Sequence, residues 1–579
     1  MTMLTKWGAA LDRSCPLPEY PRPQLRRESF YNLNGVWDYA VTPSGDEPEV
    51  WDGEIVVPFS PEAPLSGAAR GPAKDEYLHY RRGFTLPEGF QKSRVLLHFG
   101  AVDQIAEVFI NGVSAAKHSG GYWPFSTDIT SLLREGENIL RVTVRDNADD
   151  PTFAYGKQRY KRGGMWYTAQ SGIWQTVWLE SVPEVYVKSL RITPEFDEAR
   201  VRIELETALE SRAAITCDVR AADGSFVAGS WAKGGVCVVP LPGFRAWTPD
   251  DPYLYTLDIT CGEDRVESYF AMRKFSYVEL GGHKVFGLNN APLFHNGLLD
   301  QGYYPDGLLT PPSDEAMVND IETMKRCGFN MLRKHIKIEP LRWYYHCDRL
   351  GMIVWQDMVS GGQPYSFLHV SALPTLGKVD LPDQDAKPYG RSGVLSRARF
   401  RREMADTVRL LYNCPCIALW TVFNEGWGQF DALDMANELK KLDPTRFIDH
   451  ASGWQDQGYE EMKSRHIYFR PVKLKNDGRA LALTEYGGYI LAVDGHRWTD
   501  KVFGYRICRD SAALAHDYEK LMLGQVLPHI RKEGLTAAVY TQITDVEEEL
   551  NGLMTYDREV LKIPEETLRE INAALRFDA

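Results

Sequence analysis

Short runs in which apolar and polar residues alternate recur along the first part of the chain and predict β-strands. Residues 106–110 and 138–144 are clear examples, and turn residues separate them from neighbouring runs. Asn111 and Gly112 follow the first of these runs directly, and this pair is typical of a tight β-hairpin. Since no long segment of helical period intervenes, residues 1–182 are expected to form a β-sandwich.

The alternation continues through residues 183–275, a stretch of roughly immunoglobulin size. Val201, Ile203 and Leu205 fall on one face of a predicted strand, with charged residues between them on the other face. This stretch contains no grouping of residues that suggests chemistry. It is expected to be an immunoglobulin-like β-sandwich.

From about residue 276 the pattern changes, because apolar runs now alternate with segments of helical period. After Ser313, for example, Met317, Ile321 and Met324 share one face of a predicted helix that Gly328 ends. Eight apolar runs in this part of the chain are strand candidates: residues 285–296, 329–335, 352–355, 416–424, 447–450, 466–469, 480–485 and 537–542. Eight strands joined mostly through helices predict a (β/α)8 TIM barrel over residues 276–579. A doubly wound sheet is the competing architecture, since little helix is evident around the sixth strand.

Two of the predicted barrel strands end in a glutamate that aromatic and glycine residues follow. The fourth runs into Glu425 and the seventh into Glu485. A carboxylate at the tip of a buried strand is costly unless it is paired or used. The active site of a TIM barrel lies at the C-terminal ends of its strands, so these two tips would face each other across the mouth. Two such carboxylates can cleave a glycosidic bond as proton donor and nucleophile, although each could instead be a paired structural group.

The residues around the two glutamates suggest roles. Asn424 could donate a hydrogen bond to a sugar hydroxyl, and Trp427 could wall the acid and raise its pKa by desolvation. Arg333 and Tyr468 are candidate donors that would keep Glu485 ionised. Further candidates for contact with a substrate, each with a purely structural role as the alternative, are Asp300, His335, Asp357, His466, Tyr540 and Asp545.

Composition excludes several other classes of protein. The net charge of −13 argues against a nucleic-acid partner, and no run of eighteen apolar residues indicates a membrane-spanning helix. The N-terminus lacks the apolar segment of a signal peptide, and the nine cysteines show no metal-ligand spacing. Cys414 and Cys416 are expected to be reduced. These features together predict a cytoplasmic protein.

The order of sandwich, immunoglobulin-like unit and barrel resembles glycoside hydrolase family 2, which contains β-galactosidases, β-glucuronidases and β-mannosidases. The resemblance covers nearly the whole chain, and the segments that carry it are residues 97–103, 108–112, 121–130, 171–174, 424–425 and 484–487. It implies that Glu425 is the acid/base and Glu485 the nucleophile. It also implies that the anomeric configuration is retained through a covalent glycosyl-enzyme.

The chain departs from the family pattern in ways that bear on the sugar. Arg333 precedes residues 334–337 (Lys-His-Ile-Lys), where the family often has a Ser-His-Tyr-Pro-like run. The glucuronidase Asn-x-Lys element has no counterpart in residues 551–557, which lack the lysine. Other cations that could bind a sugar carboxylate are Lys334, Lys337 and Arg391. The additional C-terminal domains and the metal ligands of the large β-galactosidases have no counterpart that we can place, so no required metal and no cofactor are expected.

The sequence thus predicts a retaining exo-β-glycosidase, most similar to β-galactosidases, that acts on small glycosides or oligosaccharides. β-Glucuronidase or galacturonidase activity is the alternative, and a carbohydrate-binding protein without catalysis is the alternative from another class. Residues 1–275 are expected to be scaffold that shapes one wall of the site and mediates contacts of a possible homo-oligomer. The donor sugar stays open, since the loops expected to select it (residues 300–310, 359–395 and 489–506) contain no motif that identifies it.

Overall fold

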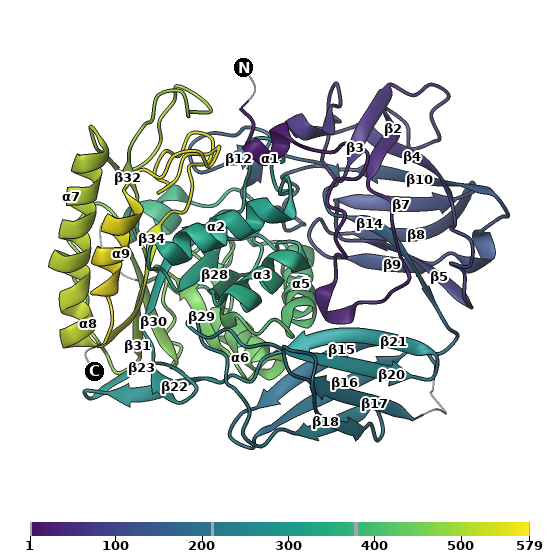
Figure 1. Cartoon of the computed structure of the whole chain (residues 1–579). Helices are drawn as coiled ribbons and strands as arrows, with labels where there is room; N and C mark the ends of the chain where they lie inside the picture. Colours follow the sequence, from purple (N-terminus) through teal and green to yellow (C-terminus); the bar gives the residue numbers. More distant parts are fainter. Residues whose placement is uncertain (1–2, 210–213, 376–379, 578–579) are drawn as a thin grey trace.

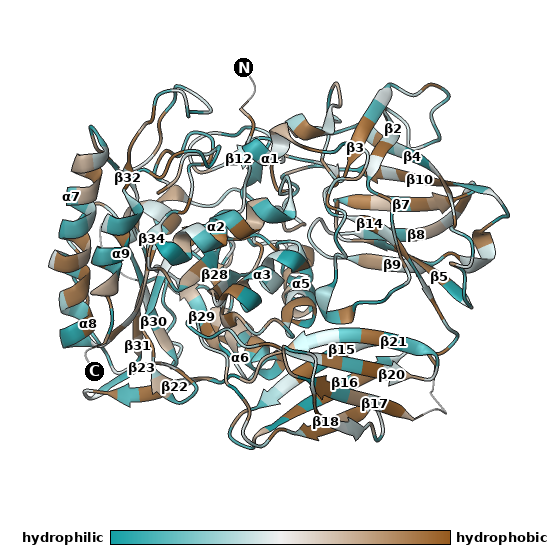
Figure 2. Ribbon diagram, in the orientation of Figure 1, coloured by the Kyte–Doolittle hydropathy of each residue, from teal (hydrophilic) through white to brown (hydrophobic). Residues whose placement is uncertain are grey.

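The computed structural model describes residues 3–209, 214–375 and 380–577, which form three parts in sequence order (Figure 1). The predicted combination of two β-sandwiches and a TIM barrel is confirmed. Apolar and polar residues alternate in bands along the strands of the sandwiches and along helices such as α2 and α7 (Figure 2). None of the described helices is long and apolar enough to cross a membrane.

The first part packs two antiparallel sheets face to face around a core that includes Trp37, Tyr80 and Val142. One sheet has the order β1 (Phe30–Asn32), β14 (Val177–Val182), β5 (Arg94–Phe99) and β9 (Phe125–Asp128). The other has the order β3 (Gly53–Val57), β2 (Gly35–Thr42), β4 (Tyr77–Thr85), β10 (Glu137–Arg145), β7 (Ile105–Ile110) and β8 (Val113–Ser119). Two short strand pairs complete it: β6 (Val102–Asp103) with β13 (Gly172–Ile173), and β11 (Gln158–Arg159) with β12 (Tyr167–Thr168).

The second part is a smaller sandwich whose core contains Val201, Ile203, Leu257 and Ile259. One sheet has the order β15 (Val187–Glu195), β16 (Arg200–Thr207) and β19 (Val236–Pro240). The other has the order β18 (Phe226–Trp231), β17 (Ile215–Arg220), β20 (Tyr255–Cys261) and β21 (Asp264–Phe270). Alternate residues of β20 are buried, as the alternating pattern predicts for a strand that covers a core on one face.

The predicted first barrel strand, residues 285–296, is wrong, because this stretch contains parts of three different strands. β23 (His283–Leu288) belongs to a small antiparallel sheet with β22 (Phe275–Leu280) and β24 (Ala291–Pro292). Asn289 and Asn290, which both have positive φ, form the turn between β23 and β24, and the first barrel strand is β25 (His295–Asp300). Phe286 of β23 stacks on Phe447 with ring centroids 4.2 Å apart, so the small sheet closes the bottom of the barrel.

The barrel strands are parallel, and chain neighbours are spatial neighbours, which excludes the doubly wound alternative. They are β25, β26 (Met331–Lys334), β27 (Ile353–Asp357), β28 (Ile417–Asn424), β29 (Phe447–Ser452), β30 (Met462–Ile467), β31 (Ala480–Gly487) and β34 (Leu535–Thr541). The backbone ladder runs from β29 through β25 and β34 to β30. Side-chain bonds close the ring between β29 and β30, since the Ser464 hydroxyl donates to Ala451 O and accepts from Gly453 N.

Helices cover the outside of the barrel. They are α2 (Asp314–Arg326), α3 (Leu341–Leu350), α5 (Val394–Leu411), α6 (Ala432–Leu442), α7 (Ser511–Leu521), α8 (Leu527–Glu533) and α9 (Glu565–Ala573). A short π-helix, η5 (Met522–Val526), joins α7 to α8, and α1 (Lys6–Ala9) lies near the start of the chain. α2 begins where the sequence predicts, since the Ser313 hydroxyl accepts a hydrogen bond from Ala316 N.

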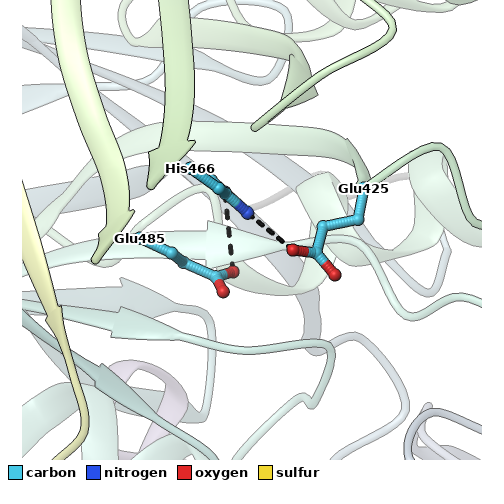
Figure 3. Close-up of side chains that lie close together, drawn as sticks. All are labelled: Glu425, His466 and Glu485. Atoms are coloured by element: carbon cyan, nitrogen blue, oxygen red, sulfur yellow. Dashed lines mark hydrogen bonds and ion pairs between the residues drawn. The ribbon is translucent and has the colours of Figure 1, made fainter. Parts of the chain in front are cut away.

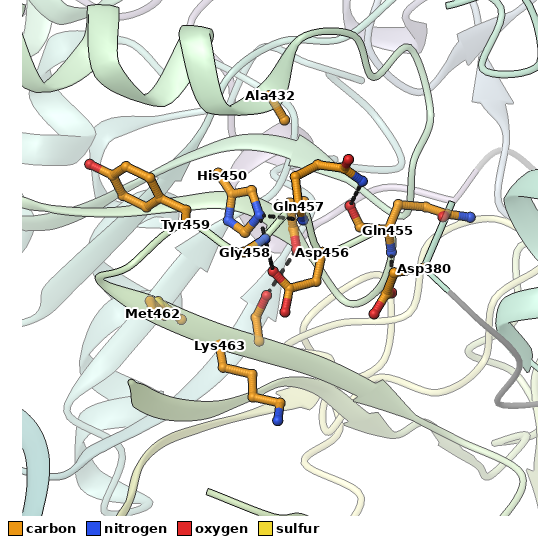
Figure 4. A network of polar contacts seen from close by, with 12 residues as sticks. Asp380, Ala432, His450, Gln455, Asp456, Gln457, Gly458, Tyr459, Met462 and Lys463 are labelled. Carbon is orange, nitrogen blue, oxygen red and sulfur yellow. Dashed lines mark hydrogen bonds and ion pairs between the residues drawn. The ribbon is translucent and has the colours of Figure 1, made fainter. Parts of the chain in front are cut away.

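Neither connection of β30 contains a helix, as the sequence suggested, and a polar network stabilises the loop between β29 and β30 instead (Figure 4). Gln457 N donates to His450 Nε2 at 3.0 Å, and the same ring nitrogen lies 3.3 Å from Asp456. Gln455 N donates to Asp380 of the insertion between β27 and α5. The loop therefore replaces helix packing with buried hydrogen bonds.

Candidate active site

Glu425 and Glu485 meet at the C-terminal mouth of the barrel, with His466 between them (Figure 3). His466 Nδ1 lies 2.9 Å from Glu425 Oε1, and Nε2 lies 3.6 Å from Glu485 Oε1. One oxygen of each carboxylate and a nitrogen of the imidazole all lie within 4.8 Å of one another. The two acids therefore open onto one space, as their positions on strands four and seven predict.

The backbone at Glu425 makes a sharp turn directly after β28. Glu425 has φ 54°, which costs a side-chain-bearing residue on the order of 1–3 kcal/mol. Its N–H donates to Ser452 O, and its carbonyl accepts from the Trp454 indole. These bonds stabilise the turn and leave the Glu425 side chain 23% exposed at the mouth. Positive φ at such a position is a conformation often found at functional sites.

Glu485 is buried and ionised. Burial alone would raise its pKa, but electrostatic interactions with His466 and Arg333 and a hydrogen bond from Tyr468 lower the pKa to about 2. Arg333 Nη1 lies 3.1 Å from Oε1, and the Tyr468 hydroxyl donates to Oε2 at 2.5 Å. Both donors that the sequence suggested thus contact this carboxylate, each on a different oxygen.

Arg333 is fully buried on β26, and all five of its N–H groups have partners. It pairs with both oxygens of Asp357 at 3.0 Å and donates to Glu485, to Thr484 O and to Asn424 Oδ1. A guanidinium with five fixed bonds is a rigid anchor for groups from three other strands. It orients Asn424, whose amide nitrogen donates no hydrogen bond within the described part of the chain and remains available to a substrate.

Asp357 and His335 form a second acid–imidazole pair beside Arg333. His335 Nδ1 lies 2.7 Å from Asp357 Oδ2, so this carboxylate serves two partners. Burial would raise the pKa of Asp357, but Arg333 and His335 hold it at about 2. Burial lowers the pKa of His335. His335 Nε2 has no partner in the described chain and can contact a substrate hydroxyl.

Asp300 ends β25 and belongs to a neighbouring network of buried charges. Lys334 Nζ bonds to Asp300 at 2.7 Å and to Glu339 at 2.8 Å, and Lys337 Nζ bonds to Glu339 and to two backbone carbonyls. Arg391 is also buried, and it donates to a backbone carbonyl and two serine hydroxyls. The three cations that the sequence offered for a sugar carboxylate are therefore all engaged in structural contacts.

Tyr540 lies away from the carboxylate pair, contrary to its expected place in the site. Its ring is buried edge-on against Tyr486 and against Tyr518 of helix α7. Side chains alternate across a strand, and the next residue, Thr541, is the one that reaches Tyr468. Tyr540 thus faces the helix layer and is not among the residues that we assign to a substrate.

Asp545 also has a structural environment. Its Oδ1 accepts hydrogen bonds from Lys562 Nζ at 2.6 Å and from Gly552 N at 2.9 Å. Burial raises its pKa to about 6. These contacts join the loop after β34 to the segment before α9. Asp545 therefore has the structural role that the sequence analysis gave as the alternative to substrate contact.

Trp427 contacts the first sandwich rather than standing alone above the acid. Its ring packs edge-on against Trp166 with centroids 5.0 Å apart and lies 5.8 Å from Tyr155. The N–H groups of Tyr155 and Gly156 donate to Ser360 O in the loop after β27. A sandwich loop therefore forms one wall of the barrel mouth, which supports the expected role of the N-terminal part.

Two aromatic residues near the acids were missed by the sequence analysis. Tyr505 stacks on Tyr468 with centroids 4.0 Å apart, and Trp454 donates to the carbonyls of Glu425 and Val370. Both lie in loops without a motif, and only tertiary contact places them here. Through Val370, the described part of the insertion between β27 and α5 contacts the turn that carries Glu425.

Glu425, His466 and Glu485 could in principle hold a metal ion, since their ligand atoms are close together. However, both oxygens of Glu485 already accept hydrogen bonds from Arg333 and Tyr468. A guanidinium at that distance also repels a second cation. The donor set suits an ionised carboxylate in a hydrogen-bonded site better than a resident metal.

Curated relatives and solved structures resemble the chain at low identity. The β-galactosidase of Thermoanaerobacter pseudethanolicus is 24% identical over 63% of this chain and 47% of its own length. The β-glucuronidase of Paenibacillus borealis is 22% identical over 82% and 85%. A β-glucuronidase of an uncultured Clostridium sp. superposes with a TM-score of 0.74 at 19% identity, covering 95% of this chain and 98% of that one. An Eisenbergiella tayi β-galacturonidase gives 0.71 at 18%, covering 96% and 99%.

The chain spans less than half of the length of the first curated relatives that it matches. Models of three parts of one family match it in order. Residues 64–183 match the sugar binding domain of glycosyl hydrolases family 2, and residues 311–473 match the TIM barrel domain of the same family. Residues 185–273, which lie between these two domains, match a third model described as glycosyl hydrolases family 2. Together these matches cover more than half of the chain, in the order that the fold shows, and the chain belongs to glycoside hydrolase family 2.

Proposed function

We propose that the protein is a retaining exo-β-glycosidase in which Glu485 is the nucleophile and Glu425 the acid/base. The observation that carries this proposal is the approach of the two carboxylates to within 4.8 Å, oxygen to oxygen. Retaining enzymes have carboxyl groups about 5–5.5 Å apart, whereas inverting enzymes need about 6.5–9.5 Å to admit a water. The short separation favours retention.

The environments of the acids fit these roles. Glu485 is ionised and fixed by Arg333 and Tyr468, so it can form a bond to the anomeric carbon as the bond to the aglycone oxygen breaks. Glu425 donates a proton to that leaving oxygen. In the second step Glu425 takes a proton from water, whose oxygen bonds to the anomeric carbon and releases Glu485. Asn424 and His335 each present a free side-chain nitrogen for sugar hydroxyls.

A panel of nitrophenyl glycosides tests the activity. We expect hydrolysis of at least one β-glycoside, and NMR of the first-formed sugar should show the β-anomer. An α-anomer as first product would exclude the double displacement. No hydrolysis of any panel member, together with measurable sugar binding, would instead favour a carbohydrate-binding protein without catalysis.

A uronide donor is the second candidate, and Lys157 favours it. This lysine lies in the sandwich loop at the mouth and is only 9% exposed. Within the described residues its ammonium forms no salt bridge and no hydrogen bond, although it lies 5.7 Å from the Trp166 ring and its charge opposes the rise in pKa that burial causes at Glu549. Burial is the main cause of the lowered pKa of His335, and the charge of Lys157 lowers that pKa further. Lys157 therefore lies close to the site. A cation there without a direct ion-pair partner would attract a sugar carboxylate.

Replacing Lys157 by Met should change the choice of sugar. We expect kcat/KM for a nitrophenyl β-uronide to fall by about 10–100-fold, the range for one hydrogen bond to a charged group. The value for a neutral nitrophenyl glycoside should change much less. Lys161→Met, an exposed position of the same loop, is the control. Equal losses on both substrates would contradict a contact between Lys157 and the sugar carboxylate. Hydrolysis of neutral glycosides alone by the unchanged enzyme would exclude a uronide donor.

We also propose a cytoplasmic location and leave a homo-oligomer as a possibility. Cys414 and Cys416 are buried thiols without a disulfide, which suits a reducing compartment. Fractionation of the native host and size-exclusion chromatography with light scattering test the two statements separately.

A further inference from the structure

A cavity of about 220 Å³ lies where the first sandwich meets the barrel, and neither Glu425 nor Glu485 lines it. Its walls come from residues 17–22, from strands β5 and β14 of the sandwich, from the start of α2 and from residues 338–342 before and within α3. Its volume corresponds to about seven molecules of liquid water. It is thus large enough for a small organic molecule.

Unpartnered polar atoms and aromatic rings line this junction cavity together. The aromatic walls include Tyr122, Trp174 and Trp178. Glu19 Oε2, His98 Nε2 and Glu339 Oε2 are buried atoms of lining residues without a hydrogen-bond partner in the described chain. His98 Nε2 lies 3.7 Å from a Glu180 oxygen, which is beyond hydrogen-bond distance. Buried polar groups are normally satisfied, so several orphans around one cavity indicate a ligand that bonds to them.

The charges around the cavity indicate that this ligand is uncharged. Arg22 pairs with Glu180 at 2.6 Å and Arg342 pairs with Asp314 at 2.5 Å, so the lining cations already have anions. His98 is neutral, since burial lowers its pKa to about 3. An anion would meet the carboxylates of the wall, and a cation would meet its guanidinium groups. Hydroxyl groups suit such a mixed surface because they both donate and accept.

We propose that the junction cavity is a second ligand site that binds one uncharged, polyhydroxylated molecule of monosaccharide size. The free oxygens of Glu19 and Glu339 accept hydrogen bonds from its hydroxyls, His98 Nε2 bonds to a further hydroxyl, and the aromatic walls cover its apolar face. This site is separate from the catalytic mouth and does not depend on which sugar is cleaved there.

Occupancy should stabilise the contact between sandwich and barrel. The other oxygen of Glu339 bonds to Lys334 and Lys337, and Lys334 in turn pairs with Asp300 at the tip of β25. A ligand on Glu339 would therefore connect the N-terminal segment to this network. Since it binds the folded chain only, it should raise Tm.

The test uses the full chain and a panel of neutral monosaccharides and glycerol. Tm shifts and calorimetric binding are measured for the unchanged protein, for Glu19→Ala, which removes one acceptor, and for Ser126→Trp at an exposed lining position, which obstructs the cavity. Competitive inhibition of aryl-glycoside hydrolysis reports the catalytic mouth in the same samples. We expect at least one sugar whose calorimetric Kd rises tenfold or more in both variants, while its inhibition constant stays unchanged.

Two results would overturn the second site. Binding and Tm shifts that are identical in all three proteins would place every bound sugar at the catalytic mouth. A crystal soaked in the best-binding sugar that shows only ordered water in the junction cavity would assign the orphan atoms to solvent. If no glycoside is hydrolysed but sugar binding is measurable and weakens in both variants, the proposed glycosidase function is contradicted and the second site is not.

Discussion

Replacing Glu485 by Gln is expected to lower kcat by on the order of 10⁴–10⁶-fold, as removal of a covalent nucleophile does in other enzymes. The amide cannot form the glycosyl-enzyme bond, and it also loses the ion pair with Arg333. The carboxylate has a pKa of about 2, so it is ionised at any pH well above that value and its protonation does not limit the unchanged enzyme. Steady-state hydrolysis of the best nitrophenyl glycoside measures the loss.

Chemical rescue separates a lost nucleophile from a damaged fold. In Glu485→Gly, azide should occupy the vacated space and displace the aglycone in a single step, which gives a glycosyl azide of inverted configuration. Glu403→Gln is the matched control, because Glu403 is buried in α5 and burial raises its pKa to about 8. An amide there replaces a protonated acid, so activity should persist. Near-normal turnover by Glu485→Gln would contradict its role.

The sequence predicted the mouth of the barrel better than its bottom. Glu425 and Glu485 could be found because a charged residue at the end of an apolar strand violates the burial pattern, and such violations mark sites. The boundary between β23 and β25 was missed because apolar residues lie on both sides of it, although Asn289, Asn290 and Pro292 between the two strands are residues typical of turns. Periodicity alone does not divide such a run.

Contacts between distant segments explain the other differences. Tyr540 was assigned to the site from its strand, yet the direction of its side chain depends on the strand's register, and its neighbour Thr541 faces the acids instead. Lys157 was missed because it lies in a different part of the fold, more than a hundred residues from the barrel. Its position follows from the docking of the sandwich loop on Ser360, and no local pattern encodes that contact.

Replacing Glu425 by Ala should divide substrates according to their leaving groups. Loss of an acid catalyst costs about 10²–10⁴-fold for a poor leaving group, which needs the proton. A dinitrophenyl aglycone departs without it, so the first step should survive and the glycosyl-enzyme on Glu485 should accumulate. A pre-steady-state burst of dinitrophenol followed by slow turnover measures this behaviour.

Azide should accelerate that slow step and distinguish the two acids. It needs no base, and it attacks the glycosyl-enzyme on the face that Glu425 serves, so two successive inversions give a glycosyl azide of retained configuration. The Glu485→Gly product is the opposite anomer. The same anomer from both variants, or a product of inverted configuration from Glu425→Ala, would contradict the assignment. The sharp turn at Glu425, the anchored carboxylate of Glu485 and the short distance between them together predict this pair of opposite outcomes.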